Sequence, residues 1–253
     1  MAEPRTLEGR VALITGAAGH IGRATAALLA ARGARVVGVD RPGADFSGVE
    51  ALLGDGGHVT VEADVTVEDD VVRAVAEAEA LAGRIDIFFN NAGIEGPQAT
   101  IPDYPVADFR RILDVNVTGV FLGLQAVMPR MIAAGGGSIV NTSSIAGLVG
   151  SATMAGYVAS KHAVLGLTRV AALEGAAHGV RVNSVHPGFI ESRMLSDIIG
   201  NMGGEVPAFA AMVPAQRLGT PEEVARAVAF LAGDDSRYMN GAALVVDGGL
   251  TVA

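Results

Sequence analysis

Seven short apolar segments recur along this chain of 253 residues, and most of them are separated by Ala-rich stretches with helical periodicity. Strands that alternate with helices pair in parallel, with the helices covering both faces of the sheet. The sequence therefore predicts an α/β protein, in which residues 1–253 form one doubly wound domain around a parallel sheet of seven strands. The expected strands are 10–15, 35–39, 59–63, 85–90, 137–142, 181–186 and 243–247, and the clearest helices are 23–31, 68–82, 108–134 (disturbed at Pro129) and 157–177.

Composition excludes several kinds of protein. The net charge is −9 and no block of Lys or Arg occurs, which argues against nucleic acid as a partner. The chain has no cysteine, so it has neither a disulfide framework nor a thiolate nucleophile or ligand, and we expect no metal site. The start lacks the apolar segment of a secretory signal, and no uninterrupted apolar run is long enough to span a bilayer. We expect a cytoplasmic enzyme or binding protein without a membrane partner.

The first apolar segment runs into a glycine-rich turn that opens a helix. Gly16, Gly19 and Gly22 let the backbone approach a pyrophosphate, which the unpaired N–H groups and dipole of the helix attract. The next strand ends in Asp40, 18 residues after Gly22, where a dinucleotide site needs a carboxylate for ribose hydroxyls. Its charge would repel a 2′-phosphate and so favours NAD over NADP. The adjacent Arg41 counts against this preference, because arginine can accept a 2′-phosphate.

Two further strand ends add polar or small residues. Asp64 follows the third strand and could accept a hydrogen bond from the adenine amino group. Asn90-Asn91-Ala92-Gly93 closes the fourth strand with small residues against which a ribose could pack. Ligands of parallel sheets bind beyond the carboxyl ends of the strands, so these residues extend the same candidate site.

Tyr157 and Lys161 lie four residues apart on an expected helix and so share one face. An ammonium beside a phenol favours the phenolate. A phenol pKa two to three units below about 10 needs about 3 to 4 kcal/mol, which Lys161 and a positive nicotinamide ring together would supply. Such a tyrosine could pass a proton to or from a substrate oxygen, which Ser144, at the end of the fifth strand, would polarise. No acidic residue is placed to make Ser144 a hydrolase nucleophile, although His162 and His186 stay open as its base.

One count supports a special role for the lysine. The chain carries 18 basic residues, of which 17 are arginine and only Lys161 is lysine. In a chain that otherwise uses arginine, a single lysine indicates a position where arginine does not serve.

These motifs resemble those of the short-chain dehydrogenase/reductase family, in its branch of about 250 residues, over essentially the whole chain. The family's Thr-Gly-x-x-x-Gly-x-Gly turn is matched by residues 15–22, except that His20 stands where the middle glycine is expected and Gly19 comes one place early. The other matches are Asn-Asn-Ala-Gly at 90–93, the serine 13 residues before the tyrosine at Ser144, Tyr-x-x-x-Lys at 157–161, the nicotinamide-gripping segment at 187–192 with Ser192 for the usual threonine, and the C-terminal Val-Asp-Gly-Gly at 246–249.

The resemblance implies a Rossmann-type fold, NAD as cofactor, hydride transfer between NAD and a secondary alcohol or ketone, and a homotetramer. It implies the catalytic residues Asn116, Ser144, Tyr157 and Lys161, with Asn116 holding a water against Lys161 for proton relay. The residues expected to contact the cofactor are Gly16, Gly19, His20, Ile21, Gly22, Asp40, Arg41, Asp64, Val65, Asn91, Ala92, Gly93, Tyr157, Lys161, Pro187, Gly188, Ile190 and Ser192.

Residues 189–214 are weakly periodic and rich in Gly, Pro and Met, and we expect them to form a lid over the substrate. If the apolar side chains of this segment line the pocket, the substrate is apolar, such as a cyclic or aryl secondary alcohol, a terpenoid, a steroid or a diketone; otherwise they only pack the lid. Glu95 could add one polar contact. The apolar residues are Met194, Leu195, Ile198, Ile199, Met202, Phe209 and Met212.

Two alternatives stay open. A 3-oxoacyl-carrier-protein reductase shares these motifs but usually prefers NADPH and needs basic residues at the pocket mouth for its acidic carrier. Asp40 and the scarcity of arginine in 189–214 count against it. A non-catalytic NAD-binding regulator of the same fold usually lacks the tyrosine or the lysine, and both are present here.

Overall fold

The computed structural model describes residues 5–53, 57–201 and 203–253. Its seven strands form one parallel sheet in the order β3-β2-β1-β4-β5-β6-β7. The predicted doubly wound α/β fold with seven parallel strands is confirmed. The strands are β1 (Val11–Thr15), β2 (Arg35–Asp40), β3 (Val59–Glu62), β4 (Ile87–Asn90), β5 (Gly137–Thr142), β6 (Val180–Pro187) and β7 (Ala243–Val246).

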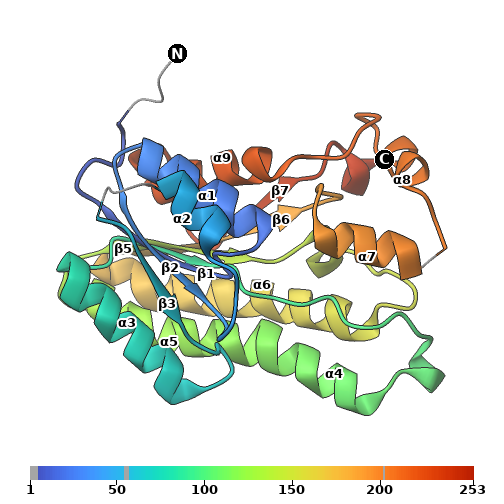
Figure 1. The fold of residues 1–253 in the computed structure, drawn as a ribbon, viewed down its shortest axis with the longest axis horizontal. Helices are drawn as coiled ribbons and strands as arrows, with labels where there is room; N and C mark the ends of the chain where they lie inside the picture. The colour runs from blue at the N-terminus through green and yellow to red at the C-terminus, as the bar shows by residue number, and fades with distance from the viewer. Residues whose placement is uncertain (1–4, 54–56, 202) are drawn as a thin grey trace.

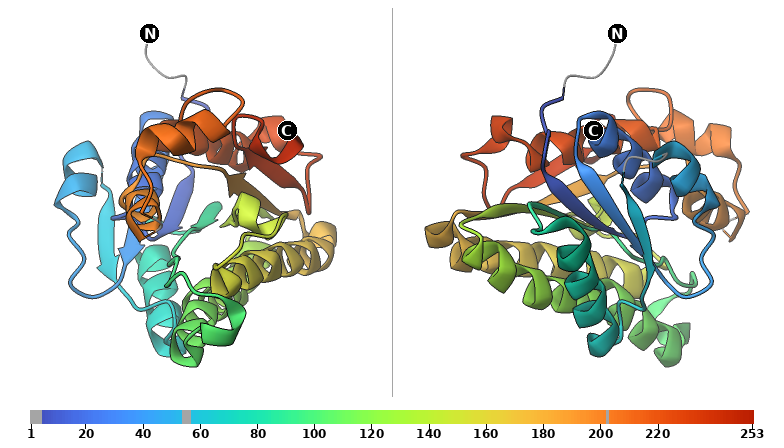
Figure 2. Two further views of the ribbon diagram at one scale, coloured as in Figure 1. Left: turned by 90° about the vertical axis from the view of Figure 1, so that its right-hand side faces the viewer. Right: turned by 60° about the vertical axis from the view of Figure 1, so that its left-hand side comes forward.

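Helices cover both faces of this sheet (Figure 1). The helices α1 (His20–Ala31), α2 (Ser47–Leu53) and α9 (Pro221–Ala232) lie on one face, and α3 (Glu68–Ala82), α4 (Val106–Leu113), α5 (Gly119–Ala133) and α6 (Ala155–Gly175) lie on the other. Two short helices, α7 (Arg193–Asn201) and α8 (Val206–Met212), lie near the C-terminus in Figure 1. Figure 2, left, turns this end of the molecule toward the viewer.

The strands are apolar on both sides because each side packs against helices. Leu13 and Phe88 belong to a core with α3, α5 and α6, whereas Ile14 and Phe89 belong to a second core with α1, α2 and α9. Successive side chains of a strand point to opposite faces, so neighbouring residues enter different cores. This two-sided burial explains why the strands are visible in the sequence as short apolar runs.

The helix predicted over residues 108–134 is a continuous helix that includes one wider turn. Residues Asp114–Thr118 form a π-helical turn between α4 and α5. The helix is disturbed at this π-helical turn and not, as predicted, at Pro129, which lies inside α5. By length and composition alone the continuous helix Val106–Ala133 could cross a membrane. However, 56% of its most apolar stretch is buried and α5 contacts α3, α6, β4 and β5, as a core helix does.

Four of the described helices were not predicted from the sequence, namely α2, α7, α8 and α9. The last of these carries a recognisable start signal. Thr220 caps α9 by accepting a hydrogen bond from the backbone of Glu223, whose side chain bonds back to the Thr220 N–H, and Pro221 is the first helical residue. This capping box and its proline could have located the helix from the sequence.

The direction of the crossovers reverses at β1, which pairs with β2 on one side and with β4 on the other. At such a point two loops leave neighbouring strand ends in opposite directions and leave a crevice between them. The residues that follow β1 and β4 therefore begin the candidate site.

Candidate active site

The glycine-rich turn after β1 brings the start of α1 against its own backbone. Gly16 has a φ of +67°, which favours glycine. A Cβ on Gly22 would lie 2.1 Å from the carbonyl oxygen of Gly16, so no larger residue fits there. Gly19 is the N-cap of α1 and no side chain caps this helix end. No side chain therefore occupies the N–H groups of the first turn, and such a helix start suits an anion.

His20 replaces the expected middle glycine without strain. It is the first residue of α1, is exposed, and does not have the positive φ that would favour glycine. Ile21 is half-buried next to it. The turn consequently keeps its form although one glycine of the family motif is missing.

Asp40 connects the end of β2 to this turn. Its Oδ2 accepts a hydrogen bond from the N–H of Ala18 at 2.9 Å, and its Oδ1 accepts one from the N–H of Arg41 at 2.8 Å. A carboxylate has further lone pairs, so ribose hydroxyls could still donate to it. Asp40 thus has a structural task in addition to the expected one, and the side chain of Arg41 is exposed beside it.

The ends of β1, β4 and β5 are joined through Asn91. Thr15 Oγ1 accepts hydrogen bonds from the N–H groups of Asn91 and Ala92 at 2.9 and 3.2 Å. The Asn91 amide donates to the Thr15 carbonyl oxygen, and Thr142 Oγ1 donates to Asn91 Oδ1 at 3.1 Å. Thr15 and Thr142 are not among the predicted site residues, although each ends a predicted strand at the same edge of the sheet.

Asn116 lies in the π-helical turn and is fully buried. Its side chain pairs with the backbone of Ile94, accepting from the N–H and donating to the carbonyl oxygen, both at 2.8 Å. Nδ2 also donates to Ser160 Oγ at 3.0 Å, and Ser160 in turn donates to the Tyr157 carbonyl oxygen. Both amide hydrogens are therefore used within the protein, and a relay water would have to donate to an acceptor position of Asn116. Ser160, fully buried one residue before Lys161, was missed.

Ser144, Tyr157 and Lys161 meet where β5 ends against α6. Lys161 Nζ donates to the Thr142 carbonyl oxygen at 2.9 Å and lies 5.5 Å from the centre of the Tyr157 ring. Gly93 completes the group, since a Cβ there would be 3.4 Å from Lys161 Nζ. The structure thus brings the four expected catalytic side chains, including Asn116 beside Gly93, into one cluster.

In the protein alone, burial favours the neutral forms of both Tyr157 and Lys161. Burial raises the pKa of Tyr157 to about 12, although a hydrogen-bonding interaction with Ser144 lowers it and the charge of Glu95 raises it further. Burial also lowers the pKa of Lys161 to about 8. Lys161 therefore does not by itself produce the predicted low phenol pKa, and the protein alone keeps Tyr157 as a proton donor. A further positive charge is needed to make the phenolate accessible near neutral pH.

The two histidines left open as bases for a hydrolytic Ser144 do not serve it. His186 Nδ1 lies 2.8 Å from the carbonyl oxygen of Ser144 rather than from its hydroxyl. His162 is exposed and its ring contacts the Val158 carbonyl oxygen. The geometry offers Ser144 as a hydrogen-bond donor to a substrate and does not offer it a base.

Residues 187–192 continue from β6 toward the lid. Gly188 N–H donates to Val246 O, and a Cβ on Gly188 would lie 2.8 Å from Asp247 Cα, so this glycine allows the close approach to the Val-Asp-Gly-Gly signature. Ile190 is buried. Ser192 Oγ donates to the Ile190 carbonyl oxygen and accepts from the Leu195 N–H, which makes it a cap for α7. Pro187 adjoins the catalytic cluster, because its carbonyl oxygen is 3.5 Å from Ser144 Oγ.

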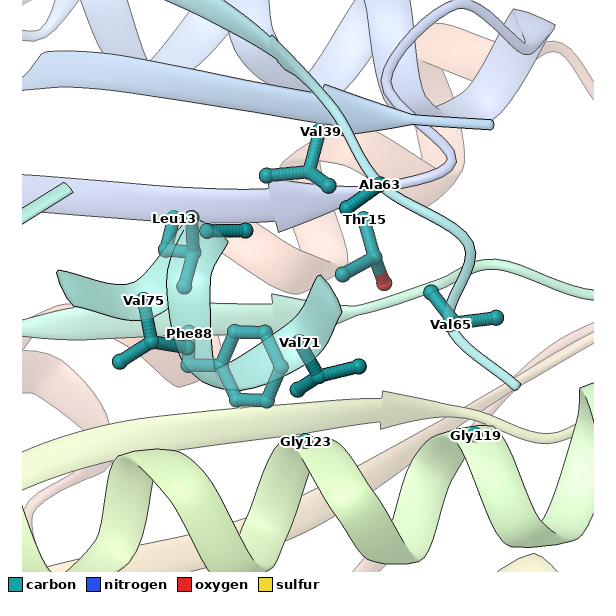
Figure 3. A pocket seen from close by; sticks show the side chains of 11 residues that line it. Leu13, Thr15, Val39, Ala63, Val65, Val71, Val75, Phe88, Gly119 and Gly123 are labelled. Atoms are coloured by element: carbon teal, nitrogen blue, oxygen red, sulfur yellow. The ribbon is translucent and has the colours of Figure 1, made fainter. Parts of the chain in front are cut away.

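On the expected adenine side, Asp64 Oδ1 accepts hydrogen bonds from the N–H and the hydroxyl of Thr66. Val65 packs against α5, where a Cβ on Gly119 would come within 2.9 Å of it. A cavity of about 20 Å³ lies here, and Figure 3 shows Val65, Phe88 and the glycines of α5 among the residues that line it. Its lining is apolar and it holds at most one water, so it is a packing defect beside the site and not the site itself.

A second cavity, of about 610 Å³, connects the glycine-rich turn with the lid. It is lined by His20 from α1, by Ser192 and Leu195 at the start of α7, and by Glu222 from α9. The expected cofactor residues His20 and Ser192, far apart in the sequence, thus border one space of molecular size.

The apolar residues of the lid mainly pack on one another. Leu195 and Ile199 form a small core with Leu218, and the rings of Phe189 and Phe209 meet edge to face at 5.3 Å. Ile198 and Met194 are half-buried, Met212 is exposed, and Met202 lies outside the described residues. Gln98 Nε2 donates to the Ile198 carbonyl oxygen at 3.0 Å and so connects the loop after β4 to α7.

The chain is similar to known proteins over almost its whole length. Residues 16–251 match the family described as enoyl-(acyl carrier protein) reductase. The chain is 43% identical to cyclohexanol dehydrogenase from Acinetobacter sp. (strain SE19), over 96% of this chain and 95% of that protein. It is 45% identical to cis-4-hydroxycyclohexanecarboxylate dehydrogenase from Sinomonas cyclohexanicum, over 96% of each.

Two solved structures are similar to this one over almost the whole chain. The crystal structure of levodione reductase superposes with a TM-score of 0.94 at 38% identity, covering 98% of this chain and 99% of that one. NAD⁺-bound xylitol dehydrogenase superposes with a TM-score of 0.92 at 38% identity, covering 96% and 99%.

Proposed function

Because the chain belongs to the short-chain dehydrogenase/reductase family, we propose that it uses NAD to interconvert a cyclic secondary alcohol and the corresponding ketone. The observation that carries the proposal is the meeting of Ser144, Tyr157 and Lys161 at the strand ends that face the uncapped start of α1. Cyclohexanol and hydroxycyclohexanecarboxylate dehydrogenases, whose names specify alcohols on six-membered rings, support the substrate class.

The residues present fit a dinucleotide. Gly16 and Gly22 leave room at the first turn of α1, where a pyrophosphate would meet free N–H groups. Asp40 would accept hydrogen bonds from the adenosine ribose, and Gly93 would let the nicotinamide half approach Lys161. Bound NAD would supply the hydride acceptor for alcohol oxidation, and NADH the donor for the reverse reaction.

The side chains of the cluster divide the proton chemistry. The Tyr157 hydroxyl, protonated in the protein alone, would give its proton to a ketone oxygen, and in oxidation its phenolate would take one from the alcohol. Ser144 would donate a hydrogen bond to the same oxygen and hold it in place. Lys161, with its pKa lowered to about 8, is able both to carry a charge and to release a proton near neutral pH. Asn116 would position the relay at Lys161.

The decisive experiment follows NADH absorbance while purified protein is offered cyclohexanol, a substituted cyclohexanol and an open-chain secondary alcohol with NAD. We expect the cyclic alcohols to be oxidised with the higher kcat/KM. Absence of turnover with every cyclic alcohol and ketone would contradict the proposal.

The acyl-carrier alternative is tested in the same assay with a 3-oxoacyl thioester and NADPH. This substrate is included because the matching family is described as enoyl-(acyl carrier protein) reductase. The charged side chains around the 610 Å³ cavity include Glu191, Glu222 and Arg193, so acidic residues outnumber arginines there. Such a lining does not complement an acidic carrier, and we expect the cyclic alcohol to be the better substrate.

We further propose that residues 1–253 act as one domain and that the protein works in the cytoplasm as a homotetramer, without nucleic acid or membrane partners. The negative net charge supports the first exclusion. Exposed apolar side chains on the outer helices, such as Val170 and Leu173 of α6, support association between copies.

A further inference from the structure

His186 is a fully buried histidine that the proposed proton chemistry does not use. It lies near the end of β6, next to Pro187. Its Nδ1 is 2.8 Å from the carbonyl oxygen of Ser144, and its Nε2 is 2.8 Å from Ser184 Oγ. Both ring nitrogens therefore have a partner, and one partner belongs to the catalytic cluster.

The partners determine the tautomer of the ring. A carbonyl oxygen can only accept a hydrogen bond, so Nδ1 carries the hydrogen that points at Ser144. Burial lowers the pKa of His186, with the charge of Lys161 acting in the same direction and the bond to Ser144 opposing it, so the ring is neutral. Nε2 is then an acceptor, and at 2.8 Å it is a nearer partner for the Ser184 hydroxyl hydrogen than the Ala242 carbonyl oxygen at 3.3 Å.

The bond from His186 Nδ1 to the Ser144 carbonyl oxygen is one of two contacts between β6 and Ser144. The Ser144 hydroxyl lies 3.5 Å from the carbonyl oxygen of Pro187, the residue after His186, and accepts from the N–H of Ala146 at 3.1 Å. Two adjacent residues of β6 therefore contact the backbone and the side chain of Ser144. Their bonds keep Ser144, two residues after the end of β5, at a fixed distance from the Pro187-Gly188 segment.

We propose that His186 is a positioning residue for Ser144. The Nδ1–H of His186 fixes the Ser144 hydroxyl relative to Tyr157 and to the Pro187-Gly188 segment. The inference rests on the proposed function. Loss of the Nδ1 donor frees the Ser144 carbonyl group to rotate and moves the hydroxyl away from the substrate oxygen, which affects kcat more than cofactor binding.

A matched pair of variants separates the two ring nitrogens. In asparagine the amide nitrogen is bonded to Cγ, as Nδ1 is in histidine, so His186→Asn keeps a donor for Ser144. In glutamine the amide is one bond further out, so His186→Gln keeps a partner for Ser184 and loses the donor to Ser144. We expect His186→Asn to keep kcat within about threefold of wild type and His186→Gln to lower it by about tenfold or more, with NADH affinity retained in both.

Two further variants distinguish positioning from general packing. Ser184→Ala removes the partner of Nε2, together with the 3.3 Å contact of Ser184 Oγ with the Ala242 carbonyl oxygen, and leaves the bond to Ser144 in place, so we expect a lower Tm with kcat unchanged. In a Ser144→Ala background the effect of His186→Gln on kcat should shrink to within about twofold, because the residue through which it acts is gone. Equal losses in the Asn and Gln variants, or full additivity with Ser144→Ala, would overturn the inference.

A measurement that needs no turnover completes the test. The imidazole ¹⁵N NMR signals that are present in the wild-type spectrum and missing from that of His186→Asn belong to His186. At pH 7 these signals should show a neutral ring with its hydrogen on Nδ1. A hydrogen on Nε2 would contradict the inference even if the glutamine variant fails to fold. Lack of wild-type turnover on any cyclic alcohol would instead contradict the proposed function and leave the tautomer as the readout for His186.

Discussion

Lys161 donates a hydrogen bond from Nζ to the carbonyl oxygen of Thr142 at 2.9 Å, which buries the only lysine of the chain at the end of β5. The side chain is 4% exposed, and burial lowers its pKa to about 8. A buried cation destabilises the folded protein, so this position is retained at a cost that surface arginines do not have.

The first prediction concerns stability. The folded pKa of Lys161 is about 8 against a usual 10.5, so between these values the unfolded chain binds more protons and stability rises with pH. Relative to Lys161→Met, which lacks this titration, the wild-type protein should gain about 3 kcal/mol in free energy of unfolding between pH 7 and pH 10.5. Urea unfolding of both proteins at four pH values measures the difference, and a difference independent of pH would refute the buried-cation assignment.

The second prediction concerns the same position. Lys161→Arg keeps the charge but spreads it over a planar fork that cannot release a proton near neutral pH and needs more room. We expect a folded protein with most of its activity lost and its residual pH optimum moved upward. A variant with near-normal kcat and a near-normal KM for NAD would show that Lys161 has no part in the reaction.

The third prediction concerns the phenol. Tyr157→Phe keeps the ring in its half-buried place and removes the proton that burial holds on the hydroxyl. Turnover should fall by at least about a hundredfold, while NADH fluorescence titration shows retained binding. Tyr238→Phe, at a fully exposed tyrosine, is the matched control and should leave kcat unchanged. Retention of a tenth of the activity in Tyr157→Phe would exclude Tyr157 as the acid.

The fourth prediction concerns cofactor choice. We expect kcat/KM to be at least about tenfold higher with NAD than with NADP, because Asp40 repels a 2′-phosphate. Asp40→Asn is a cleaner variant than Asp40→Ala, since its amide oxygen can still accept from Ala18 N–H and preserve the glycine-rich turn. The asparagine variant should have a smaller preference for NAD over NADP, and the alanine variant should bind both cofactors more weakly. Equal use of NADP by the wild type would contradict the role of Asp40.

The fifth prediction concerns assembly. Leu173 is 81% exposed on α6, close to exposed Val170, and we expect both to be covered in a tetramer. Leu173→Arg should therefore lower the mass measured by light scattering at micromolar concentration. Leu52→Arg, at another exposed leucine on α2, should leave the mass unchanged. A monomeric wild-type protein would rule out the tetramer.

Several features of this protein could be predicted because they depend on neighbours in the chain. The strands are buried on both faces, so they occur as apolar runs, and their regular alternation with helices determined the parallel sheet. The glycines at 16 and 22 and the pairing of Tyr157 with Lys161 follow from local backbone geometry. Their chemistry was therefore readable from spacing alone.

Other features needed the tertiary structure, because they arise between segments far apart in the sequence. Asn116 reaches Ile94 only through a π-helical turn that no local pattern marks, and His186 meets Ser144 only because β5 and β6 are neighbours. The predicted fall in the pKa of Tyr157 depended on two nearby charges, Lys161 and a nicotinamide ring, whereas in the protein alone desolvation by the surrounding fold raises this pKa. Burial sums over every element around a group, so the sequence identified the candidate catalytic side chains while the packing around them set their protonation.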